Sequence, residues 1–140
     1  MKRAILILSL LSASLLALSS CEKADGPIDL SGCQVTTTDE VIPYVGDEYM
    51  SQNTDIRISK NPYRSKSTIS SLEPDIKSPS GTNWLIYIDL NPRAKWSHDC
   101  LYRFVNAKNG KITDIIGHTM PDNIGENFTQ IKSYVWGSPE

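Results

Sequence analysis

Residues Trp84–Lys111, WLIYIDLNPRAKWSHDCLYRFVNAKNGK, contain the clearest β-sheet signal in this 140-residue chain. In Trp84–Leu90, Trp, Ile, Ile and Leu occupy alternate positions, with Leu, Tyr and Asp between them. This period of two is typical of a strand, and Asn91-Pro92 ends it. Leu101–Ala107 (LYRFVNA) alternates in the same way and predicts a second strand.

A tight turn is predicted to join the second strand to a third. Asn109-Gly110 is a strong hairpin signal, because both central positions of such a turn need positive φ. Lys111–Gly117 (KITDIIG) then forms the returning strand. The three segments predict an antiparallel meander from about 84 to 117, in a small α+β fold with one or two short helices.

The run Tyr102–Ile112, with the aromatic-rich strand before it, resembles small propeptide-like modules of exported bacterial proteins. These modules, of the PepSY and streptopain-prosegment kind, often read as an aromatic strand followed by a strand that ends in a "tGkv" turn. The resemblance implies an antiparallel sheet packed against one helix. It also implies a role as a peptidase inhibitor or a chaperone-like prosegment.

The flanking segments give weaker signals. Thr54–Ser59 (TDIRIS) alternates as a half-buried strand does. Lys60–Asn83 is rich in Ser, Pro, Lys and Asn, which predicts a poorly ordered surface loop or, alternatively, a short helix near Ser67–Leu72. In Asn123–Gly137 apolar residues recur at helical spacing, which favours a short helix, although Tyr134-Val135-Trp136 has the composition of a strand.

The amino terminus resembles a bacterial lipoprotein signal peptide. Met1-Lys2-Arg3 is positively charged, and Ala4–Leu18 is an apolar run of about 15 residues, which is short for a transmembrane helix. The run ends in Leu18-Ser19-Ser20-Cys21, which resembles a lipobox. In that family the peptide is cut before the Cys, whose thiol carries diacylglycerol and whose new amino group is usually acylated, with palmitate as a common chain.

The resemblance divides the precursor into three parts: a signal peptide at 1–20, a lipidated tether at 21–32 and a single small exported domain at 33–140. Two or more acyl chains on Cys21 hold a protein firmly on a membrane. Glu22 is not the Asp that retains many such lipoproteins in the inner membrane, so the outer membrane is expected. The alternative is an ordinary signal peptide with Cys21 kept as a thiol.

Two cysteines remain in the exported domain. An oxidising compartment favours a disulfide between Cys33 and Cys100. It would close a loop of nearly 70 residues and stabilise the fold by about 4 kcal/mol on a chain-entropy estimate. The alternative is that one of the two is a reactive thiol.

Chemistry-bearing side chains gather in Trp96-Ser97-His98-Asp99-Cys100. We expect a structural role for this cluster, with Trp96 packed near the disulfide and His98 at the beginning of a strand. Metal binding by His98 and His118, or a catalytic thiol at Cys100, are the alternatives. No nucleophile elbow and no phosphate-binding glycine motif occurs, so we predict no catalytic residue, no metal and no cofactor.

The charge balance argues against nucleic acid as a partner. Without Lys2 and Arg3 the chain has a net charge of about −4. The four basic residues between 57 and 66 are diluted by polar residues, and we interpret them as a solvated loop rather than an anion site: Arg57, Lys60, Arg64 and Lys66. The aromatic residues after position 83 are expected to form the core; the alternative is that some of them line a binding surface.

Three functions remain open at this point. The first is a non-enzymatic binding module held on the membrane by its lipid, with a protein partner and a possible role in inhibiting an exported peptidase. The second is a structural accessory subunit of an envelope complex. The third is a small enzyme or metal carrier that uses His98 and Cys100.

Overall fold

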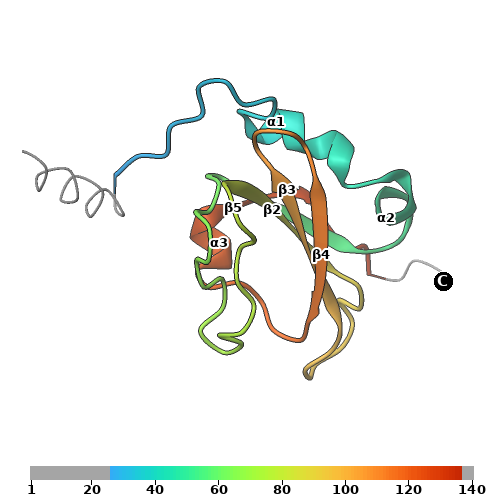
Figure 1. Ribbon diagram of the computed structural model, residues 1–140. Coiled ribbons are helices and arrows are strands. Elements are labelled where there is room, and N and C mark those ends of the chain that lie inside the picture. The colour runs from blue at the N-terminus through green and yellow to red at the C-terminus, as the bar shows by residue number, and fades with distance from the viewer. Residues whose placement is uncertain (1–25, 137–140) are drawn as a thin grey trace, which may run out of the picture.

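The computed structural model describes residues 26–136 (Figure 1). The predicted signal peptide at 1–20, the lipidation site Cys21 and the first part of the predicted tether lie outside this range. None of the helices formed by residues 26–136 has the length and apolar character needed to span a bilayer.

Five antiparallel strands form one open sheet in the order β4-β3-β2-β1-β5. The strands are β1 (Asp55–Ser59), β2 (Asn83–Asp89), β3 (Cys100–Asn106), β4 (Ile112–Gly117) and β5 (Phe128–Lys132). The predicted meander is confirmed as β2, β3 and β4, and the predicted strand at 54–59 is confirmed as β1. Together with short helices the sheet makes an α+β fold, as predicted.

Strand β2 lies at the centre of the sheet and is buried on both faces. Trp84, Ile86 and Ile88 contribute to one core cluster, whereas Leu85 and Tyr87 contribute to the other. Side chains of neighbouring strand residues point to opposite faces, so the two clusters lie on the two sides of the sheet. We name the side of Trp84 the first face and the side of Tyr87 the second face.

Short helices cover the first face (Figure 1). They are α1 (Thr38–Val41), the 3-10 helix η2 (Ile42–Tyr44) and α2 (Asp47–Ser51). Val41 and Val45 are fully buried there, and the indole Nε1 of Trp84 donates to the carbonyl of Val35 over 2.9 Å. The PepSY-like resemblance implied one helix against the sheet, but the helices in residues 26–136 have only three to five residues each.

The long connection from β1 to β2 covers the second face, which corrects the expectation of a poorly ordered surface loop. Ile69 and Ile76 are buried in the core with Phe104 and Phe128. Isolated bridges pair Tyr63 with Asn83 and Thr68 with Lys77. The connection is polar because only a few of its residues face the sheet, and the alternative of a helix near Ser67–Leu72 is also wrong.

The hairpin between β3 and β4 differs from the predicted turn in one respect. Only Gly110 has positive φ, at 74°, and Asn109 does not. The side-chain oxygen of Asn106 accepts hydrogen bonds from the backbone of Lys108 and Asn109, which shapes the turn locally. A Cβ on Gly110 would lie 2.7 Å from the hydroxyl of Tyr44, so the position requires glycine on two grounds.

The predicted helix at Asn123–Gly137 is wrong. A four-residue helix, α3 (Ile124–Asn127), leads directly into β5. β5 pairs with β1, and Phe128 is buried in the second-face core. The unpaired edge of β1 gives this segment hydrogen-bond partners as a strand, which outweighs the weak helical spacing.

Candidate functional site

Three connections converge at the end of the sheet where β2 ends and β3 begins. They are residues 90–99, residues 118–122 after β4, and the part of the 60–82 connection around Leu72. Hydrogen bonds tie them together: the Ser97 hydroxyl donates to the His118 carbonyl over 3.1 Å, and the His118 backbone N–H donates to Glu73 over 2.7 Å. Separate segments of the chain thus form one connected surface.

This surface encloses a hollow of about 440 Å³, which we name the Trp96 pocket. Three large apolar side chains stand exposed at it: Leu72 at 77%, Trp96 at 73% and Met120 at 57%. The other lining residues are Tyr87, Asp89, Ala94, Lys95, Ser97, His98, Cys100, His118 and Thr119. A mainly apolar hollow with a few convergent polar groups is typical of a binding site.

The structure places Trp96 differently from the sequence prediction. We expected it to pack beside a disulfide, but its ring is mostly exposed on the 90–99 connection. No period-two or helical pattern distinguishes this loop, so its exposure could not be read from the sequence. Leu72 and Met120 were not predicted as site residues either, because both stand in polar stretches.

His98 lies just before β3, as predicted, and is held on both sides of its ring. Nε2 lies 2.7 Å from Asp89 Oδ1, and Nδ1 lies 2.8 Å from the Trp96 carbonyl oxygen. Both neighbours are acceptors, so only the imidazolium, with two N–H donors, satisfies both contacts. The bond to the Trp96 carbonyl and, after it, the contact with Asp89 raise the pKa of His98 above its usual 6.5.

This geometry predicts a pH dependence of stability. Because the folded-state pKa of His98 is raised, its stabilising contribution is fully present below about pH 6.5 and is lost as the pH rises through the folded-state value. We expect the stability difference between the unsubstituted chain and His98→Gln to shrink between pH 6 and 8. Urea unfolding at several pH values measures it, and a difference independent of pH would contradict the assignment.

Cys100 is a poor candidate for a catalytic thiol. Its side chain is buried at the base of the Trp96 pocket, and its Sγ lies 3.4 Å from the Thr119 carbonyl oxygen. Burial raises the pKa of this thiol to about 11, which leaves it protonated at neutral pH. His98 is engaged by Asp89 and Trp96, so it does not act as the base of a Cys–His pair.

The structure does not bring Cys33 and Cys100 together. Cys33 packs against the core of the first face, whereas Cys100 belongs to the core of the second face. Both are free thiols in this structure. The sheet lies between the two side chains, so the expected bridge is not formed in this arrangement of the strands.

A metal held by His98 and His118 would need a third ligand, and the described residues 26–136 do not place one beside both histidines. His118 lies 3.1 Å from Asp99 and 3.5 Å from Glu73, and His98 is paired with Asp89. Within residues 26–136 no group of three His, Cys, Asp or Glu side chains is arranged to hold a metal ion. The histidines instead connect the loops that build the Trp96 pocket.

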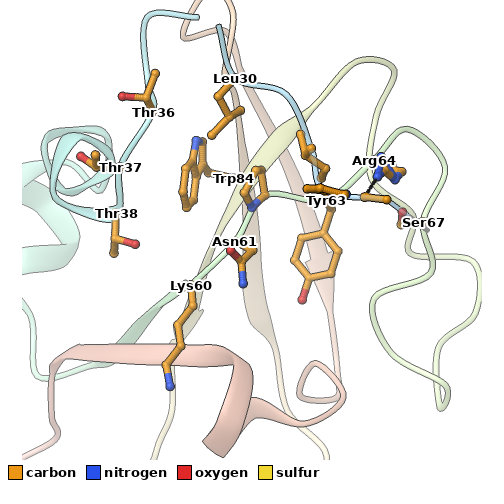
Figure 2. Close-up of a pocket in the computed structure, with 14 residues that line it drawn as sticks. Leu30, Thr36, Thr37, Thr38, Lys60, Asn61, Tyr63, Arg64, Ser67 and Trp84 are labelled. Atoms are coloured by element: carbon orange, nitrogen blue, oxygen red, sulfur yellow. Dashed lines mark hydrogen bonds between the residues drawn. The ribbon is translucent and has the colours of Figure 1, made fainter. Parts of the chain in front are cut away.

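A second hollow, of about 730 Å³, lies beside residues 26–30 (Figure 2). Figure 2 shows Leu30 beside the ring of Trp84, with Thr36, Thr37 and Thr38 along one side. Lys60 and Arg64, which we expected in a solvated loop, line the hollow, and the Arg64 guanidinium donates to the carbonyl of Gly26. This contact and the packing of Leu30 place residues 26–30 against the rest of the fold.

Comparison of the chain with known protein families, with curated proteins and with solved structures gives no match.

Proposed function

We propose that this chain is a lipid-anchored binding protein of the bacterial envelope. In this proposal residues 1–20 are removed, Cys21 carries the acyl chains in the outer membrane, and the domain at 33–140 holds an exported protein partner without catalysing a reaction. The observation that carries the binding role is the Trp96 pocket, where three exposed apolar side chains from three separate connections surround a hollow.

The exposed side chains favour a protein as the partner. Solvated apolar groups of this size are costly unless another molecule covers them, and exposed apolar patches commonly mark interaction sites. Tryptophan is enriched among the residues that dominate protein–protein binding energy. The polar groups at the pocket, Asp89, His98 and Ser97, are already paired within the chain, so they hold the loops in place.

A non-enzymatic role is supported by the state of the reactive groups. Cys100 is buried and its pKa is raised, and both histidines contact carboxylates. An anchored domain that acts by binding a partner needs no reactive thiol or imidazole.

Trp96→Ala is the variant that tests the binding role. Truncating an exposed interface tryptophan is expected to weaken partner binding by roughly 30-fold, equivalent to about 2 kcal/mol, while stability changes by less than about 0.5 kcal/mol. Trp136→Ala is the matched control, because Trp136 is equally exposed, at 74%, but lies beyond β5 and outside the pocket. It should leave binding unchanged.

The partner itself can be found by photo-crosslinking in the native envelope. Trp96→benzoylphenylalanine should crosslink to one exported protein, identified by mass spectrometry, and Trp136→benzoylphenylalanine should not. Equal crosslinking at both positions, or none at position 96, would argue against the pocket as the binding site. A partner that fractionates with a large assembly would favour the role of an accessory subunit.

Peptidase inhibition is the finer form of the proposal. Trp96 is exposed on the 90–99 connection, and an exposed aromatic side chain is suited to fill a specificity pocket of a peptidase. If the crosslinked partner is a peptidase, the purified chain should inhibit it at a one-to-one ratio without being consumed. Cleavage of the chain at a catalytic rate would instead make it a substrate.

A further inference from the structure

The outer edge of β4 is a second surface without a partner. β4 ends the sheet order, and no other strand within residues 26–136 pairs with its outer side. Ile112 and Ile116 are exposed, at 42% and 53%, with Asp114 between them on the same face. An open edge with exposed apolar residues is a template for another strand.

The charges at the two ends of β4 have opposite signs. Lys108 and Lys111 stand at the hairpin that precedes the strand. At the other end Glu73 accepts from the His118 backbone, and Asp99 contacts the His118 ring. A strand that fits this edge in the antiparallel sense therefore needs positive charge at its beginning and negative charge near its end.

We propose that the occupant is β4 of a second copy of this chain. Antiparallel pairing about a two-fold axis at Asp114 places Ile112 opposite Ile116 of the second copy, and Ile116 opposite Ile112. The same register places Lys111 opposite Gly117, next to Glu73 and Asp99. The apolar positions and the charges at the two ends of this edge are thus complementary to themselves.

The central pair in this register, Asp114 with its own copy, brings like charges together. Each carboxylate is already held by Arg103, with Nε to Oδ1 and Nη2 to Oδ2 both at 2.8 Å. Each Arg103 lies in β3, on the side of its carboxylate away from the axis, so the two guanidinium groups flank the two carboxylates and offset part of their repulsion. The pairing joins two five-stranded sheets into one continuous sheet.

The symmetry suits two anchors in one membrane, and here the inference rests on the proposed function. The two-fold axis between identical antiparallel strands is perpendicular to the sheet. The first faces of both copies therefore lie on the same side of the joined sheet. Leu30 and Cys33, at the end of the tether, pack on the first face, and both tethers therefore leave the dimer on that face. Confinement in the same bilayer raises the effective concentration of the two copies.

Cysteine crosslinking tests the register. Two tagged copies of the full chain, Ile112→Cys and Ile116→Cys, are co-expressed, and membranes are oxidised and run without reductant. The mixture should give a disulfide dimer. Each variant alone should give none, because like positions lie about 13 Å apart along the strands, beyond the reach of a disulfide. The unsubstituted chain controls for the native cysteines.

Absence of the mixed dimer overturns the proposal, and so does equal crosslinking of each variant alone. The substituted positions are exposed, so the fold is expected to persist, and urea unfolding of both variants checks this. Membrane attachment is scored on the same samples. If the variants stay attached to the membrane but do not crosslink, the dimer is contradicted and the lipid anchor is not. If both variants are released from the membrane, the lipid anchor is contradicted.

Discussion

Phe104→Ala is expected to lower the free energy of unfolding by about 3–5 kcal/mol, enough to unfold a large part of a small domain. The ring is fully buried on the second face, in one core cluster with Ile69, Ile76 and Phe128. These residues come from three different segments. Removal of the ring leaves a cavity that a sheet strand cannot close by moving.

Urea unfolding followed by the fluorescence of buried Trp84 measures this loss. Leu72→Ala is the control, because Leu72 lies in the same long connection as Ile69 but is exposed, and its loss should change stability by less than about 0.5 kcal/mol. If Phe104→Ala costs no more than Leu72→Ala, the 60–82 connection does not cover the second face.

Arg103→Ala is expected to lower the free energy of unfolding by roughly 2–4 kcal/mol. The guanidinium is mostly buried on the first face and joins two parts of the fold: its Nη1 donates to the Val45 carbonyl over 2.9 Å, and its other nitrogens hold Asp114. Its Cζ also lies 5.3 Å from the ring of Tyr49. The truncation leaves a carbonyl and a carboxylate without their donor.

Arg57→Ala is the matched control for this effect. Arg57 pairs with Asp55 within β1, but its side chain is more exposed than that of Arg103, at 28% against 15%, and the pair does not connect separate segments. We expect Arg57→Ala to lower the free energy of unfolding by less than about 1 kcal/mol. Arg103→Lys should recover only part of the loss, because an ammonium cannot make the paired contact with Asp114. Similar losses for Arg57→Ala and Arg103→Ala would contradict the bridging role of Arg103.

The strands of the meander were predictable because their signal is local. Alternation along Trp84–Leu90 and Leu101–Ala107 identifies β2 and β3 to within a residue or two, and Gly110 marks the hairpin. Each of these features depends on neighbours in sequence. The pairing of the strands then follows from the short connections between them.

The segments that contact the sheet from a distance were not predictable. Ile69 and Ile76 are two isolated apolar residues in a polar stretch, and only the presence of an uncovered sheet face gives them a place. In the same way, Phe128 and Ile131 fit a helical spacing locally, but the open edge of β1 makes the segment a strand. Tertiary context overrides local preference in both cases.

The candidate site was not predicted as a binding site. Trp96, Ser97, His98 and Cys100 line the pocket together with His118, whereas the sequence predicted a structural role for this cluster, and the expected packing of Trp96 and the expected bridge at Cys100 are not seen. The partner of His98 left a usable signal: Asp89 ends β2 and lies opposite Cys100, so an antiparallel pairing brings it near. The place of Leu72 could not be predicted from the sequence, because only the folded path of the 60–82 connection brings it to the Trp96 pocket.

Intact-mass spectrometry of the processed protein, extracted from its native membrane, most directly tests whether this domain acts from a bilayer. We expect the chain to begin at Cys21 and to carry the added mass of a diacylglyceryl group, with a further acyl group on the new amino terminus. A water-soluble product whose mass is that of the bare polypeptide, with Cys21 unmodified, would contradict the account.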